Sequence, residues 1–169
     1  MTHLFRLATL ITVFSLAFTA NVFAATETLK GPAPQFALPA KGGGQVQLAD
    51  FQGDVVMINF WASWCGPCRQ EMPLIEGLHK KYGKLGFTVL AVNVDTNPAD
   101  AQKMLAEIPT SFPIGFDSKN KISELYDVDS MPSTVMVDRK GNMRFLHRGY
   151  KPGYEADYEK QIRTLLREP

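Results

Sequence analysis

The stretch VVMINFWASWCGPC at residues 55–68 decides the fold of this chain. Its first seven residues are almost continuously apolar, which predicts a buried central strand. Apolar residues then recur at spacings of three and four from just after Cys65 to near Gly83, which predicts an amphipathic helix. A pair of cysteines, Cys65 and Cys68, is therefore expected at a strand-to-helix junction.

This junction gives the two cysteines unequal chemistry. The unpaired backbone N–H groups and the positive dipole end of the helix favour a thiolate at Cys65, which we expect to be exposed and to attack. Cys68 lies one turn further on the same face, so we expect it to be the resolving thiol. Pro67 fits a first helical turn, where its missing N–H would have no partner. The alternative is a structural staple, but so short a loop would stabilise little.

No other cysteine occurs in the 169 residues. Two cysteines cannot build a disulfide-rich scaffold, and alone they cannot complete a four-ligand zinc site. A metal site would need His79, His147 or carboxylates, and we predict none; we expect these two histidines on solvated surfaces. The 18 basic and 17 acidic residues indicate no broad basic field, so we predict no nucleic-acid binding.

The first 24 residues have the pattern of a secretory signal peptide. A weakly positive start with His3 and Arg6 precedes an uncharged, mostly apolar stretch that ends at Val22-Phe23-Ala24. We expect cleavage after Ala24 and export to the periplasm, an oxidising compartment. The alternative is an uncleaved anchor in the inner membrane, since the uncharged stretch is long enough to span a bilayer.

Beyond the leader we predict an extended linker at 25–34 and one domain at 35–169. A small hairpin is expected at 35–38 and 46–48, a second buried strand at 87–94, and a short strand at 114–116. A second hairpin is expected at 133–137 and 143–147. Helices are predicted at 98–108, 119–126 and 154–167. Strands that alternate with helices in this way favour a three-layer α/β/α sandwich with a mixed central sheet.

Residues 55–68 resemble the active-site segment of thioredoxin-fold proteins. The wider pattern is similar to the exported TlpA/ResA-like thiol–disulfide oxidoreductases of the redoxin superfamily, over about residues 32–167. The segments that match this family are RQEMP at 69–73, MPST at 131–134, VDRKG at 137–141 and an extra segment at 96–117. The resemblance implies a thioredoxin fold with an N-terminal hairpin and a central insertion, and no cofactor beyond the cysteine pair.

The resemblance also implies roles for residues outside the pair. Pro132 matches a cis-proline that faces the cysteines and holds substrate backbone. Partner proteins are expected to contact the residues around it and around the cysteines: Trp64, Gly66, Pro67, Met131 and Gly149. Ordinary packing for Met131 and a plain turn at Gly149 are the alternatives.

Asn59 departs from cytosolic thioredoxins, which carry a buried aspartate there that takes up a proton. Asparagine does not titrate, so that proton route is missing. Glu71 follows Cys68 by three residues and matches a glutamate near the active site of ResA-like proteins. We expect it to accept the proton of Cys68; a surface acid near a helix N-terminus is the alternative.

The sequence thus predicts an exported protein-disulfide reductase that acts on protein cysteines and is a monomer. The resemblance implies a membrane electron donor of the DsbD or CcdA type and substrates such as apocytochrome c or metal-site cysteines. Two other functions are considered. A thiol peroxidase would carry Thr or Ser three residues before the reactive cysteine, where Ala62 stands. A copper-carrying module similar to the SCO proteins would separate its cysteines by three residues, not two.

Overall fold

A computed structural model of the chain describes residues 26–169. The expected leader lies outside the described residues. A mixed sheet of six strands forms the centre, in the order β1-β8-β7-β4-β5-β6. The strands span β1 Glu27–Thr28, β4 Val55–Trp61, β5 Phe87–Asn93, β6 Ile114–Phe116, β7 Ser133–Val137 and β8 Met143–Arg148. β4, β5 and β6 are parallel neighbours, whereas β7, β8 and β1 add antiparallel pairs.

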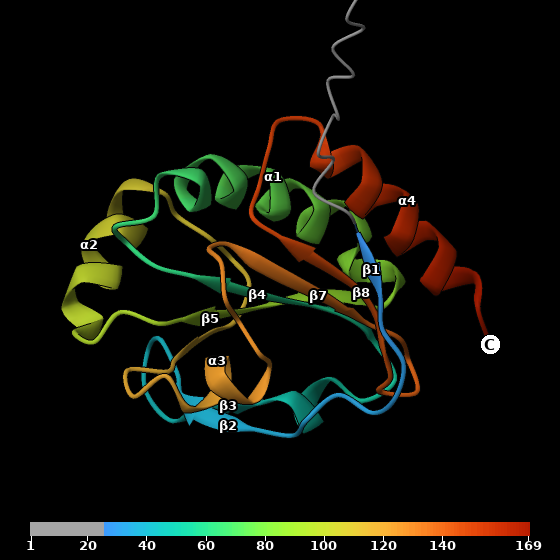
Figure 1. The fold of residues 1–169 in the computed structure, drawn as a ribbon, viewed down its shortest axis with the longest axis horizontal. Helices are drawn as coiled ribbons and strands as arrows, with labels where there is room; N and C mark the ends of the chain where they lie inside the picture. The colour runs from blue at the N-terminus through green and yellow to red at the C-terminus, as the bar shows by residue number, and fades with distance from the viewer. Residues whose placement is uncertain (1–25) are drawn as a thin grey trace, which may run out of the picture.

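Helices and a hairpin cover the two faces of this sheet (Figure 1). The helices are α1 Gly66–Tyr82, α2 Pro98–Glu107, α3 Lys121–Leu125 and α4 Tyr154–Arg167. α1 and α4 lie on one face, while α3 and a two-stranded hairpin of β2 Ala37–Pro39 and β3 Gln45–Gln47 lie on the other (Figure 1). Two short 3-10 turns, η1 Leu48–Phe51 and η2 Gly83–Leu85, complete the elements. The predicted three-layer α/β/α architecture is confirmed.

The core is built around the two central strands. Every residue of β4 and of β5 is buried, as expected for parallel strands covered on both faces. The hairpin packs closely on the edge strand β6, because Gly115 has no side chain: a Cβ there would approach Leu38 to 3.0 Å. The closing helix α4 contributes Tyr158, Ile162 and Leu165 to the opposite side of the core.

Two segments differ from the sequence-based expectations. The stretch predicted as an extended linker contains β1, which pairs with β8 and so adds an edge to the sheet. Pro32 also forms an isolated bridge with Asn142. A two-residue strand leaves no signal in the sequence, because backbone pairing at an edge needs no particular side chains.

The prediction that both histidines lie on solvated surfaces is wrong. His147 in β8 is buried, because α4 covers that part of the strand and Gln161 lies 2.9 Å from its Nε2. His79 is half-buried: its Nδ1 accepts from the Val89 amide at 3.4 Å, and its ring packs edge-on against Phe112.

Candidate active site

The cysteine pair lies where β4 ends and α1 begins. Cys65 is the N-cap residue of α1, and its Sγ accepts a hydrogen bond from the Cys68 amide at 3.1 Å. The two residues form a disulfide with their Cα atoms 5.3 Å apart. The expectation that Cys65 is exposed is wrong for this oxidised form: it is 4% exposed and Cys68 is 1% exposed. The disulfide holds the Cys65 sulfur back against the first turn of the helix.

A groove opens beside the pair. Trp64 precedes Cys65 and is 70% exposed, which is unusual for so large an apolar side chain. Gly66 and Pro67 are also exposed in the first turn of α1. Trp64 and Met131 line the same groove of about 370 Å³, together with Val94, Thr96, Asn120, Ser123, Glu124 and Val128. The structure therefore brings two of the expected partner contacts together.

The loop before β7 reaches the same place. Residues 59 and 60 of β4 pair with Thr134 and Ser133 of β7, which places Pro132 next to the end of β4 and the cysteine loop. The Met131–Pro132 peptide bond is cis, as expected. Gly149 donates its amide to the Pro132 carbonyl at 2.7 Å and has a φ of +76°, which glycine adopts freely. Gly149 thus holds the proline loop.

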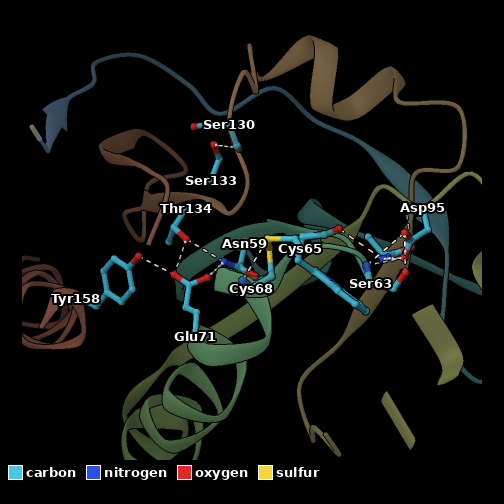
Figure 2. Close-up of a disulfide and its surroundings, with 12 residues drawn as sticks. Asn59, Ser63, Cys65, Cys68, Glu71, Asp95, Ser130, Ser133, Thr134 and Tyr158 are labelled. Carbon is cyan, nitrogen blue, oxygen red and sulfur yellow. Dashed lines mark hydrogen bonds between the residues drawn. A yellow bond between two sulfur atoms is a disulfide. The ribbon is translucent and has the colours of Figure 1, made fainter. Parts of the chain in front are cut away.

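Glu71 lies one turn beyond Cys68 on α1 and points into the protein (Figure 2). It is 1% exposed, which excludes the surface-acid alternative. Its Oε2 accepts from Asn59 Nδ2 at 2.8 Å, and its Oε1 accepts from the hydroxyls of Tyr158 at 2.7 Å and Thr134 at 3.4 Å. Burial raises the pKa of Glu71 to about 7, although these hydrogen bonds lower it. A group with this pKa can exchange a proton near neutral pH.

Tyr158 and Thr134 were not predicted as site residues. Tyr158 has the spacing of a core residue on the amphipathic helix α4, and only its hydroxyl reaches the site. Thr134 stands in an apolar strand, where its Oγ1 also accepts from Asn59 Nδ2 at 2.9 Å. A buried strand or helix face that contains a single hydroxyl residue is a weak signal, because the hydroxyl can equally serve a local backbone bond.

A second polar cluster anchors the loop that carries the pair. Asp95, two residues after the end of β5, is buried and accepts the Ser63 amide at 2.9 Å and the Ser63 hydroxyl at 3.0 Å (Figure 2). Asn93 Nδ2 donates to the same carboxylate at 2.8 Å. A polar residue at the carboxyl end of a parallel strand is a signal that could have revealed this cluster.

Comparisons with known proteins agree with this site. The Redoxin family model matches residues 28–162. Thiol-disulfide oxidoreductase ResA of Geobacillus kaustophilus is 32% identical over 133 residues, which are 79% of this chain and 75% of that protein. Thioredoxin-like protein YneN of Bacillus subtilis is 40% identical over 120 residues, 69% of each chain.

A solved structure from Chlorobium tepidum, proposed to be the thiol:disulfide interchange protein DsbE, superposes with a TM-score of 0.79 and 43% identity. It covers 82% of this chain and 97% of its own. Two further observations concern residues 26–169 alone. No helix there is both long and apolar enough to cross a membrane. No group of three or more His, Cys, Asp or Glu side chains there is arranged to hold a metal ion.

Proposed function

The chain belongs to the Redoxin family and is a thiol–disulfide oxidoreductase, and from this premise we propose that it reduces disulfides of exported proteins through Cys65 and Cys68. The observation that supports this proposal most is the disulfide at the N-terminus of α1. It lies next to the exposed Trp64, which lines a groove together with Met131. An extended segment of a partner protein would lie in this groove against the Pro132 loop. We propose that this segment contacts the residues around the pair and the loop: Trp64, Gly66, Pro67, Met131 and Gly149.

The reaction transfers two electrons in two exchanges. The Cys65 thiolate attacks one sulfur of a partner disulfide, so that a Cys65–partner disulfide forms and the first partner thiolate leaves. Cys68, having lost its proton, then attacks the Cys65 sulfur. This second exchange forms the Cys65–Cys68 disulfide and releases the second partner thiolate. The partner has been reduced to two thiols, and the pair has been oxidised to the form seen in the structure.

Glu71 is proposed to take the proton of Cys68 before the second exchange. Cys68 is 1% exposed, so water has little access to its thiol, and burial disfavours the thiolate. Glu71 lies three residues further on the same helix, and its pKa of about 7 suits transfer to and from a thiol. Asn59, which cannot titrate, orients the carboxylate by donating to Oε2.

The direction of electron flow is proposed from the dipeptide between the cysteines. Gly66-Pro67 is the pair found in thioredoxin, whose potential is about −270 mV, and this favours a reductant. The expected leader would place the protein in the periplasm, where a reductant must be recharged. We therefore propose a membrane donor of the DsbD or CcdA type. Apocytochrome c or metal-site cysteines are the proposed substrates.

The test is a trapping experiment in the native host. Cys68→Ser removes the resolving thiol, so the Cys65–partner disulfide should accumulate and yield covalent adducts on non-reducing gels. The proteins in these adducts, identified by mass spectrometry, would name the substrates. Cys65→Ser is the matched control and should give no adduct. Full disulfide-reductase activity in Cys65→Ser would contradict the assignment of the attacking thiol.

A further inference from the structure

The two carboxylate oxygens of Glu71 face partners of different chemistry (Figure 2). Oε2 accepts from Asn59 Nδ2 at 2.8 Å, and an amide nitrogen only donates. Oε1 lies 2.7 Å from the Tyr158 hydroxyl and 3.4 Å from the Thr134 hydroxyl. A hydroxyl group can either donate or accept. The ionised carboxylate is satisfied by all three donors, but the two oxygens are not equivalent once a proton arrives.

A proton on Oε2 would have to share that oxygen with the N–H of Asn59, and the amide nitrogen could not accept it. In a buried site such an unpaired donor is costly. A proton on Oε1 meets the Tyr158 oxygen, which has free lone pairs after its own O–H rotates away. The Thr134 hydroxyl interacts with the Tyr158 hydroxyl as well, and a hydroxyl oxygen can accept that rotated O–H.

We propose that Glu71 receives its proton at Oε1 and that Tyr158 is the positioning residue that governs this uptake, donating to the ionised carboxylate and accepting from the protonated one. This inference rests on the proposed role of Glu71 as proton acceptor. It assigns a part in the reaction to helix α4, whose Tyr158 lies 87 residues from Glu71 along the chain.

The position of the Tyr158 hydroxyl is fixed by its own packing. Tyr158 is 0% exposed, and its ring packs edge-on against His147 with centroids 4.7 Å apart. Ile162 and Leu165 hold the same face of α4 in the core. Because the ring is held independently of the hydroxyl, Tyr158→Phe removes one oxygen and leaves the packing in place.

Other titratable groups around Glu71 are few. The cysteine pair lies on the same helix and does not titrate while it is a disulfide. Tyr150, in the segment before α4, interacts electrostatically with Glu71, and burial raises its pKa to about 12, so it stays neutral. His147 of β8 lies behind the Tyr158 ring, and burial lowers its pKa. Asn59 and Thr134, from β4 and β7, carry no titratable proton.

The test measures the protonation of Glu71 directly in the oxidised full-length protein. Infrared spectra across a pH titration should show a protonated-carboxyl band that Glu71→Gln removes. In Tyr158→Phe the ionised form loses a charge-assisted hydrogen bond, which is stronger than the neutral one that the protonated form loses. The midpoint of the carboxyl titration should therefore rise by about one pH unit, a tenfold change in proton affinity. The matched control is Tyr126→Phe, which also loses a hydroxyl bond, to the Pro34 carbonyl, on the other face of the sheet; its midpoint should be that of the wild type.

The outcomes separate this inference from the proposed function. A band that Glu71→Gln removes but Tyr158→Phe does not move would overturn the role of Tyr158 and leave Glu71 as the acceptor. An equal shift in Tyr126→Phe would also overturn it, because the effect would then be general. If Glu71→Gln resolves mixed disulfides at the wild-type rate at every pH, the proposed role of Glu71 fails. This outcome does not depend on how the infrared band titrates.

Discussion

Glu71 is a carboxyl group that burial holds against ionisation, and this has a consequence for the stability of the protein. Its pKa rises from 4.5 to about 7 on folding, so between these values the folded state binds a proton that the unfolded state has released. Stability from this group is therefore complete below about pH 4.5 and is lost as the pH rises through 7. Glu71→Gln should remove this loss, which amounts to about 3 kcal/mol.

Urea unfolding of the wild type and Glu71→Gln, measured across this pH window, checks the prediction. The difference between the two free energies of unfolding isolates Glu71, because the histidines act equally in both proteins. The pKa values of His79 and His147 are lowered by burial, so their own contribution rises with pH and opposes that of Glu71. A pH-independent difference would show that Glu71 is ionised throughout the window.

At the same scale, the sequence located some site residues and not others. Cys65, Cys68 and Pro132 were predictable because a motif and its place between elements agree. Tyr158 and Thr134 were not, since their positions fit an apolar helix face and a buried strand equally well. His147 was misplaced because strand periodicity does not tell which helix will cover the strand. Only the packing of α4 onto β8 decides that.

The loop between β4 and α1 is anchored by the adjoining end of β5. The carboxylate of Asp95 accepts the Ser63 amide and hydroxyl, and Asn93 donates to it as well. Asp95→Ala would leave the Ser63 amide without its partner, and we expect the free energy of unfolding to fall by about 2–3 kcal/mol. Amide hydrogen exchange at residues 63 and 64 should speed up.

Ser63→Ala is the matched variant for this element, because it removes the hydroxyl bond and keeps the amide bond. It should cost about 1 kcal/mol and leave the exchange of the residue 63 amide slow. Equal effects of the two variants on exchange would mean that the loop is held by its own backbone. The bounds of the strand and helix around this loop were predictable from apolar periodicity. The contact between Asp95 and Ser63 was not, because it depends on which strand ends meet in the assembled sheet.

For the molecule as a whole, the proposed direction of electron flow has a thermodynamic counterpart. A cysteine pair that reduces its partners is itself oxidised readily, so the folded protein must not stabilise the dithiol relative to the disulfide. In strong oxidants the folded protein stabilises the dithiol. The Cys65–Cys68 disulfide also restricts the unfolded chain, by about 2 kcal/mol for so short a loop. We therefore expect the oxidised protein to be more stable than the reduced protein by about 2 kcal/mol.

Denaturant unfolding of both redox forms at one pH measures this difference, with Cys65→Ser/Cys68→Ser as the control that responds to neither oxidant nor reductant. The pH should lie well below 7, where Glu71 of the oxidised form is protonated. A reduced form that is more stable by several kcal/mol would contradict the proposal, because each 1.4 kcal/mol raises the potential by about 30 mV toward that of an oxidant. The Cys65–Cys68 pair would then donate disulfides to its partners, and the Cys68→Ser adducts would contain proteins that acquire disulfides.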